Sequence, residues 1–436
     1  MSNQSDEYRD DDLKQARPVA EPGGIAGYGR RISSSFRNPV YRLYYYSLVG
    51  HWAPLQMQMQ ARTLLIYRIT GSGSLLGTMA LAGSIPMLIL SLYGGALADR
   101  LDKRKILIIG QASSAALALG VALALSFNYL SADVPGSWWI LIVSSLVQGI
   151  IMGLMMPSRA SMVPEIVEPE DLMNAISLNN MGMNVFRIMA PAATGFIIDA
   201  WDFAAAYYIM TAFYMSSNIF LMRIRTKRHE RTTVQQQHST TTEVADGLRY
   251  IRSHSTIMLI LIFTLACTIL GMPFTMLLPM FTEDILDVGA SGMGVVLAVS
   301  GIGAIAVSLV LASMPNKKRG IMMLFCGFIL SLSLIAFSFN TSWFLALVLA
   351  VFIGLGQTGQ TAFGFVLVQY YVDPAYRGRA MSFMMLGFGL AGLGAFFGGM
   401  LADSISIVWS IGGLSVALGA VCLWVLFFSP RLRNLD

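Results

Sequence analysis

Long apolar runs, separated by short polar stretches, cover most of the 436-residue chain. Twelve of these runs reach roughly twenty residues or more, which is the length that an α-helix needs to cross about 30 Å of hydrocarbon. They lie at about 41–67, 73–98, 105–127, 137–158, 173–198, 203–223, 256–281, 291–314, 320–339, 343–366, 380–402 and 406–428. The pattern predicts an all-α membrane protein with twelve transmembrane helices.

Polar segments divide the runs into two groups of six. Residues 1–40 carry charges of both signs together with Gly and Pro, and are predicted to form a disordered tail. Residues 224–255 form a second polar segment, in which EVADGLRYIRS is predicted to lie on the membrane as a short amphipathic helix. The predicted organisation is therefore an N-terminal six-helix bundle over 41–223, the linker, a C-terminal six-helix bundle over 256–429, and a tail over 430–436.

The two halves also resemble each other in sequence. VPEIVEPEDLMNAISL (163–178) and VQYYVDPAYRGRAMSF (368–383) share four residues at a constant offset, and each segment precedes the fifth helix of its half. The shared pairs are Val167 with Val372, Pro169 with Pro374, Ala175 with Ala380, and Ser177 with Ser382. Repeated halves of this kind are typical of transporters in which two bundles are related by a pseudo-two-fold axis and the substrate site lies between them.

Composition supports a membrane protein, and the distribution of Lys and Arg predicts how the chain is oriented in the membrane. Hydrophobic residues make up 55% of the chain and charged residues 12%, and the mean hydropathy is +0.63. Of the 29 Lys and Arg residues, all but Arg62, Arg68 and Arg187 lie in segments that share one side of the membrane with the N-terminus. Because such segments face the cytoplasm, both termini are predicted to be cytoplasmic. The net charge of +5 is explained by this bias, so we predict no nucleic-acid partner.

The loop between the second and third runs reads GGALADRLDKRKIL (94–107). This stretch resembles the cytoplasmic loop signature of the major facilitator superfamily, with Asp102 where the family usually has glycine. The resemblance implies a gating motif of Gly95, Asp99, Arg100 and Arg104, in which the charged residues latch against the eleventh helix and favour the outward-facing state.

Three further segments narrow the resemblance. PSRASMVPEIVEPEDLMNA, EVADGLRYIRSH and VDPAYRGRAMS are similar to a bacterial branch that contains enterobactin exporters and macrolide efflux pumps. The resemblance implies a location in the bacterial cytoplasmic (inner) membrane. RIMAPAATG (187–195) resembles the antiporter motif of exporters and retains Pro191 and Gly195 as a helix-bend motif. The alternative is a helix that is merely kinked and closely packed.

The first apolar run is unusual because it contains polar residues on two faces of a helix. Ser47, His51, Pro54, Gln58 and Arg62 share one face, and Gln56, Gln60 and Thr63 lie on nearly the opposite one. Because a charge within the bilayer is costly, we expect the first face to look into a wet cavity and the second to hydrogen-bond to a neighbouring helix.

The fourth and fifth runs repeat this spacing and complete a predicted central vestibule. Its candidate residues are His51, Gln58, Arg62, Gln148, Met152, Met155, Arg159, Asn180, Asn184 and Arg187. Alternatives remain for three of them: Arg62 and Arg159 can extend to the membrane surface, and His51 can be a neutral packing residue.

The positions of the carboxylates lead to predictions about the substrate and about the coupling ion. None of the 24 Asp and Glu residues is assigned to the middle of a helix, so the vestibule favours an anionic or neutral amphiphile over a lipophilic cation. Proton-coupled relatives often carry a buried acid and tend to have Gly-Asp-Trp where this chain has Gly50-His51-Trp52. Because histidine titrates near neutral pH, His51 is the candidate proton carrier.

The leading hypothesis is thus a proton-coupled exporter of amphiphilic small molecules, such as siderophores or drugs, that works by alternating access. Its expected partners are the substrate, protons and the lipid bilayer, and we expect it to act as a monomer. An importer or flippase of an anionic amphiphile and a non-transporting membrane sensor or scaffold are the alternatives. We predict no enzymatic activity, no metal and no cofactor, because the two GxGxxG strings lie in hydrophobic runs and no nucleotide or zinc motif is present.

Overall fold

The computed structural model describes residues 35–100, 102–224, 240–313, 318–373, 376–433 and 435; the side chains of 91–100, among others, are not described. All secondary structure in these ranges is helical, which confirms the predicted all-α class. The helices of the N-terminal half are α3 (Pro39–Thr70), α4 (Gly73–Arg100), α5 (Lys103–Ser126), α6 (Trp139–Ile166), α7 (Leu172–Ala200) and α8 (Phe203–Arg223). Those of the C-terminal half are α10 (Ser255–Gly271), α11 (Pro273–Asp284), α12 (Gly289–Ser313), α13 (Arg319–Ser338), α14 (Trp343–Tyr371), α15 (Arg377–Ser404) and α16 (Ile407–Phe428). The remaining elements are the 3₁₀ turn η1 (Ser35–Arg37), the linker helix α9 (Thr240–Ser253) and α17 (Pro430–Arg433).

Each of the twelve apolar runs lies on helical structure, and the seventh is divided between α10 and α11. The break falls where Pro273 begins α11, because proline lacks the N–H that would continue the preceding helix. Within the described residues, ten helical segments are long and apolar enough to cross a membrane. The helices α3 and α8 are not among them. The protein is thus a multi-pass membrane protein.

Residues 35–40, which the sequence assigned to the tail, belong to the helical fold. The Ser35 hydroxyl donates a hydrogen bond of 2.7 Å to Oδ1 of Asn174, and the Asn38 carboxamide caps α3 by accepting from the N–H groups of Val40 and Tyr41. With Pro39 as its first residue, α3 has a strong start signal. The rest of the predicted tail, residues 1–34, lies outside the described residues.

The surface of the helices is apolar, as a lipid environment requires. Large side chains such as Phe325, Phe344, Leu309 and Phe427 are exposed around the helix bundle. Exposed tryptophans gather where helices begin or end, for example Trp139 at the start of α6. Aromatic side chains of this kind are typical of the membrane interface.

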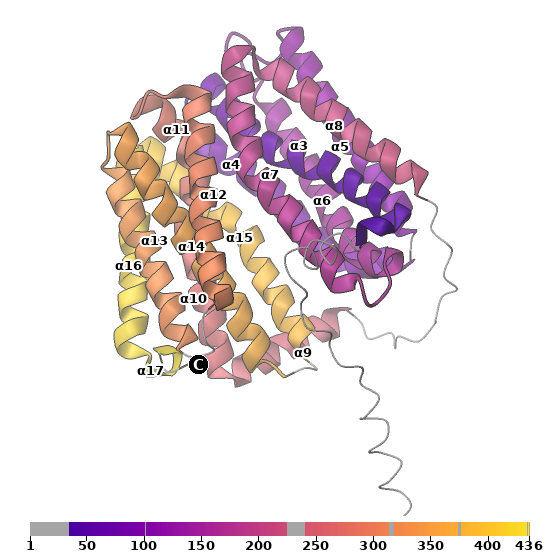
Figure 1. Cartoon of the computed structure of the whole chain (residues 1–436). Helices are drawn as coiled ribbons and strands as arrows, with labels where there is room; N and C mark the ends of the chain where they lie inside the picture. Colours follow the sequence, from indigo (N-terminus) through magenta and orange to yellow (C-terminus); the bar gives the residue numbers. More distant parts are fainter. Residues whose placement is uncertain are drawn as a thin grey trace, which may run out of the picture.

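The two halves form separate groups of helices whose most extensive contacts run along two helix pairs (Figure 1). Helix α4 packs along α15, and α7 packs along α12. The packing runs from Gly73 to Leu88 on α4 and from Ile188 to Gly195 on α7. Toward the other end, where α9 and α17 lie, the halves diverge. We call the end with Gly73 and Gly195 the closed end, and the opposite one the divergent end.

The linker helix α9 lies at the divergent end, over the segment predicted to be amphipathic. It is attached to the turn between α14 and α15. The Tyr250 hydroxyl donates to Oδ2 of Asp373 at 3.1 Å, and the Tyr250 ring stacks on that of Tyr376 with centroids 4.1 Å apart. The helix therefore belongs structurally to the C-terminal half.

Candidate functional site

One face of α7 runs from the contact between the halves into the region where they diverge. Pro191 and Gly195 pack against α12, and Asn180, Asn184 and Arg187 continue the same helical face toward the divergent end. All three polar side chains are exposed. The structure thus brings these three predicted site residues together on a helix face directed between the halves.

The contact between α7 and α12 is close and contains a buried amide. A Cβ atom at Gly195 would overlap the carbonyl oxygen of Ala290, so the absence of a side chain permits this approach. Gln60 of α3 lies beside the contact. The amide orientation that pairs donors with acceptors puts its nitrogen 2.7 Å from the Pro191 carbonyl oxygen and its oxygen 3.2 Å from the Gly294 nitrogen. Gln60 therefore hydrogen-bonds to both halves. The bend predicted at Pro191 stays a prediction.

Two aspartates at the closed end each cap a helix of the opposite half. Asp403, near the end of α15, accepts hydrogen bonds from the backbone N–H groups of Gly73 at 2.6 Å and Ser74 at 2.9 Å, at the start of α4. Asp199, near the end of α7, accepts from the backbone N–H of Ser291 at 2.7 Å, at the start of α12. The two links are equivalent under the internal repeat, because each joins the fifth helix of one half to the second helix of the other.

A second pair of links at this end connects α3 to α11. Arg68 Nη2 lies 2.8 Å from Oε1 of Glu283 and 4.0 Å from Oδ1 of Asp199, and the Tyr67 hydroxyl donates to Asp284. We call the contacts of Asp403, Asp199, Arg68 and Tyr67 with the opposite half the closed-end links. They join the halves through groups that water would solvate if the halves separated.

Within the N-terminal half, His51 belongs to a buried polar cluster with Gln111 of α5 and Arg159 of α6. His51 Nδ1 lies 3.1 Å from Oε1 of Gln111, and Arg159 Nη2 donates to the same oxygen at 3.1 Å. One amide oxygen therefore serves both a guanidinium and an imidazole. Among the described residues, Nε and Nη1 of Arg159 have no hydrogen-bond partner.

The cluster continues along α3 toward the closed end. Gln58 Oε1 accepts from the Tyr214 hydroxyl of α8 at 3.2 Å, and Arg62 lies close to Tyr214. Gln148 of α6 donates to the Ser114 hydroxyl at 3.5 Å. Arg62 Nε and Nη2 also lack a partner within the described part of the chain. The interior of the N-terminal half thus holds guanidinium N–H groups that are shielded from solvent and have no carboxylate partner among the described residues.

In this conformation the candidate residues of the predicted vestibule do not all lie on one exposed surface. The face of α3 that carries His51, Gln58 and Arg62 is buried against α5 and α8 of its own half. Gln148 and Met155 of α6 are likewise buried against α5, while Met152 and Arg159 are half-buried. The physical reason is that α5 and α8 supply hydrogen-bond partners for His51 and Gln58, so this face of α3 packs inside its own bundle although Arg62 keeps unpartnered N–H groups.

In this conformation the loop lies at the divergent end, and one of its basic residues binds the end of α8. Arg104 donates to the carbonyl oxygens of Leu221 at 3.2 Å and Met222 at 2.6 Å. A cation is stabilised there because the last carbonyls of a helix have no partner within it. Asp102 caps α5 by accepting from the Arg104 N–H at 3.0 Å, which explains an acid at this position. Gly95, Asp99 and Arg100 lie in the stretch whose side chains are not described. The latch against the eleventh helix, implied for the outward-facing state, stays a prediction.

Sequence reasoning missed Gln111, Tyr214 and the pairing of the closed-end links. Gln111 and Tyr214 lie in apolar runs in which the polar residues at helical spacing are mostly small hydroxyl side chains, such as Ser114 and Thr211, so they gave little signal. Arg68 was recognisable as the single basic residue predicted at the outer surface, where several acids also fall. Among the described residues, no group of three His, Cys, Asp or Glu side chains is arranged to hold a metal, and Cys267, Cys326 and Cys422 are buried free thiols.

Two helix groups that meet along paired helices at one end and diverge at the other define a membrane transporter of the major facilitator fold. A bacterial homologue of the human lysosomal transporter Spinster, solved in an inward-facing and unoccupied conformation, has this fold, with a TM-score of 0.64, 14% identity, and coverage of 89% of this chain and 96% of that one. The chain belongs to the family of transmembrane secretion effectors of this superfamily, whose model matches residues 33–436.

Curated relatives of the chain are exporters and other transporters. The chain is 23% identical to the staphyloferrin A transporter of Staphylococcus aureus, over 81% of this chain and 86% of that protein. It is 21% identical to macrolide efflux protein A of Streptococcus pyogenes, over 84% and 90% of the two chains. The predicted resemblance to exporters is thus confirmed, and the protein is a transporter, not an enzyme.

Proposed function

We propose that the protein is a secondary active exporter of amphiphilic small molecules in the bacterial cytoplasmic membrane, with twelve membrane crossings and both termini in the cytoplasm. The observation that carries the proposal is the asymmetry between the two ends. The halves are linked by Asp403, Asp199 and Arg68 at one end. The polar face of α7 is exposed toward the other end. Alternating access requires such links to break as the opposite end closes.

The orientation follows from the basic residues. Arg377 and Arg319 lie at the divergent end, and Arg68 lies at the closed end with the four acids of the closed-end links. The positive-inside rule therefore supports a divergent end that faces the cytoplasm. In this conformation a substrate would reach Asn180, Asn184 and Arg187 from the cytoplasm or from the inner leaflet.

The substrate proposed is an anionic or neutral amphiphile. Arg187 provides a positive charge on the exposed face of α7, and exposed Met181 and Met183 provide an adaptable apolar surface beside it. The unpartnered N–H groups of Arg62 and Arg159 also favour negative charge in the N-terminal half. The names of the relatives, a staphyloferrin A transporter and a macrolide efflux protein, support transport of bulky molecules.

Protons are the proposed coupling ion, and His51 is the proposed carrier. A second proton on the imidazole would place two cations around the Gln111 oxygen, because Arg159 already donates to it at 3.1 Å. Repulsion between them would favour movement of α3 relative to α6. Protonation of His51 would in this way alter the packing of two helices of one half.

The first test is ligand binding by the purified protein. A panel of catecholate siderophores, lysophospholipids, macrolides and lipophilic cations is screened for an increase in melting temperature, because a ligand that binds only the native state stabilises it. Stabilisation by anions that is lost in Arg187→Gln, and kept in the control Arg223→Gln at the exposed end of α8, is expected. Stabilisation by cations alone would contradict the proposed substrate class.

The second test measures transport in oriented proteoliposomes with the ligand selected by the first. Efflux driven by an imposed pH gradient is expected, with loss of the pH response in His51→Ala. If His51→Ala transports as well as the wild type at every gradient, His51 is not the proton carrier. Net uptake in the opposite direction would indicate an importer or flippase, and the absence of flux for every stabilising ligand would indicate a sensor.

A further inference from the structure

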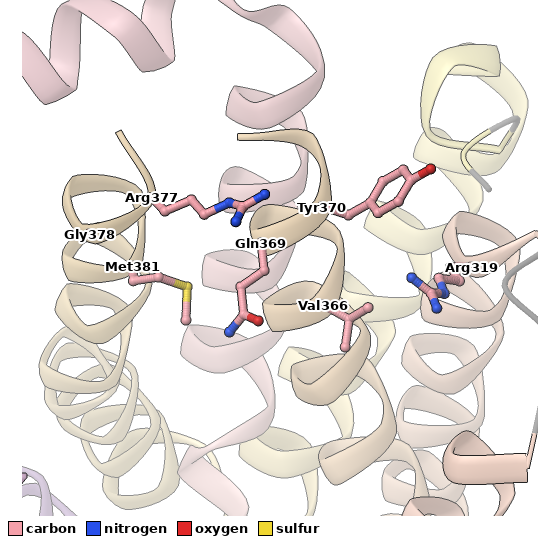
Figure 2. Close-up of a pocket in the computed structure, with 7 residues that line it drawn as sticks. All are labelled: Arg319, Val366, Gln369, Tyr370, Arg377, Gly378 and Met381. Carbon is pink, nitrogen blue, oxygen red and sulfur yellow. The ribbon is translucent and has the colours of Figure 1, made fainter. Parts of the chain in front are cut away.

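A basic pocket lies at the divergent end of the C-terminal half, away from α7 and from the His51 cluster. It has a volume of about 460 Å³ and is formed where α13 and α15 begin and α14 ends. It is lined by Arg319, Val366, Gln369, Tyr370, Arg377, Gly378 and Met381. Figure 2 shows the guanidinium groups of Arg377 and Arg319 reaching toward α14 from its two sides, with Gln369 and Val366 between them.

The surroundings of Arg377 leave its charge available to a ligand. Its Nε donates to the carbonyl oxygen of Val372 at 3.2 Å, which holds the side chain back along the end of α14. Among the described residues, no carboxylate lies within 4.0 Å of it. The described acid of the adjacent turn, Asp373, accepts a hydrogen bond from Tyr250 instead.

The N-terminus of α15 adds to the positive potential. The residue before it, Tyr376, provides no side-chain cap, and Gly378 places the first turn of the helix at the pocket wall. At the start of α13, by contrast, the Gly320 N–H already donates to the Leu435 carbonyl oxygen at 3.2 Å. The dipole at a helix N-terminus favours an anion, so the start of α15 acts together with the two guanidinium groups.

The remaining lining residues combine an apolar wall with aromatic and basic side chains, as expected for a site that binds an amphiphile. Val366 and Met381 lie one turn deeper along α14 and α15 than the charged groups and present an apolar wall. Tyr370 is 63% exposed, and the Arg319 guanidinium lies over its ring at 6.0 Å from the centroid. Tyrosine and arginine at helix ends are typical of the level of lipid head groups.

We propose that this pocket binds the anionic head group of an amphiphile, with phosphate or carboxylate oxygens held by Arg377 and Arg319 and the apolar part directed along Val366 and Met381. The site does not depend on the direction of transport or on the identity of the exported molecule. Its ligand is either an anionic phospholipid of the bilayer or a soluble anion, and the two sources are separated by experiment.

The test measures binding to the purified full-length protein in detergent by its melting temperature. The probes are dihexanoyl phosphatidylglycerol, dihexanoyl phosphatidylcholine, citrate and inorganic phosphate. Phosphatidylglycerol is expected to stabilise the wild type and phosphatidylcholine is not. In Arg319→Gln/Arg377→Gln the apparent affinity is expected to fall at least about tenfold, because charge-assisted hydrogen bonds are lost. Arg252→Gln, an exposed arginine on α9 at the same end, is the matched control and keeps the affinity.

The pattern among probes identifies the source of the anion. Stabilisation by phosphatidylglycerol alone assigns the pocket to a bilayer lipid, and equal stabilisation by citrate or phosphate assigns it to a soluble anion. Equal effects of the two lipids, or an unchanged affinity in the double variant, overturn the proposal. If the double variant does not fold, the single variants and Arg377→Lys are used, and an affinity that does not differ between Arg377→Gln and Arg377→Lys has the same consequence.

Discussion

Removal of the Asp403 carboxylate is predicted to shift the protein from the conformation described here toward one that is open at the closed end. The carboxylate accepts three hydrogen bonds across the interface, from the Ser72 hydroxyl at 2.8 Å and from the N–H groups of Gly73 and Ser74. In the alternative conformation the halves separate at this end and water replaces these contacts. Asp403→Ala therefore destabilises one conformation and leaves the other nearly unchanged.

The magnitude follows from the chemistry of a helix cap. Loss of a capping side chain costs about 0.5 to 2 kcal/mol, and a charged cap at an exposed helix N-terminus contributes within this range. The Ser72 hydroxyl also accepts from the Leu75 N–H at 3.3 Å, so α4 keeps one cap of its own. We therefore expect a loss of about 1 kcal/mol or more, which changes the ratio of two populations about fivefold or more.

The assay is a distance distribution between two spin labels at the closed end, one on each half. Asp133→Cys, between α5 and α6, and Thr341→Cys, between α13 and α14, are exposed positions, and the native cysteines are buried. Asp403→Ala is expected to increase the long-distance population. The matched control is Asp202→Ala, because Asp202 accepts from the Ala205 N–H at 2.6 Å and thus caps a helix of its own half.

The result that would refute the reasoning is equal behaviour of the two variants. If Asp403→Ala and Asp202→Ala give the same distance distribution, a cap between halves does not hold the closed end together. Asp199→Ala tests the equivalent link, and its effect is expected to add to that of Asp403→Ala because the two carboxylates share no described partner.

Further predictions concern the α7 contact and the buried cluster. Gly195→Val is expected to increase the long-distance population in the same spin-label assay, because a side chain there overlaps the Ala290 carbonyl; Gly413→Val, where nothing lies within 4 Å, is the control, and equal distributions would argue against a close contact. Gln111→Leu is expected to lower the unfolding free energy by about 1 to 3 kcal/mol, because Arg159 and His51 lose their shared acceptor. Thermal unfolding measures this loss, and a variant as stable as the wild type would show that the cluster is solvated. Arg104→Gln is expected to destabilise the N-terminal half by breaking its bonds to the end of α8, and unchanged unfolding would contradict this role.

Several features of the fold are predictable because they depend on local sequence. The length and apolarity of a run determine whether a helix crosses the bilayer, and each run predicted in this way lies on helical structure. Helix ends also carry local signals, such as Asn38 before Pro39 at the start of α3. The membership of the superfamily was recognisable from the loop motif and the internal repeat for the same reason.

Local sequence does not determine which neighbours the polar face of α3 contacts, and this is the clearest example of its limits. Helical spacing shows that His51, Gln58 and Arg62 share a face, and the cost of burying charge suggested a wet cavity. The structure places partners for this face on α5 and α8, with Gln111 separated by 60 residues from His51 and Tyr214 by 156 from Gln58. A face satisfied by another helix and a face satisfied by water have the same sequence pattern.

By itself, then, the sequence determined the helices, their grouping into two halves and the superfamily, because bilayer thickness and backbone hydrogen bonding act on each segment separately. Only the tertiary structure decided which side of each helix meets which neighbour. It paired Asp403 with the start of α4, 330 residues away from Gly73, and Asp199 with the start of α12. Such pairs depend on the packing of whole helices, and packing is a property of two segments together that neither one specifies alone.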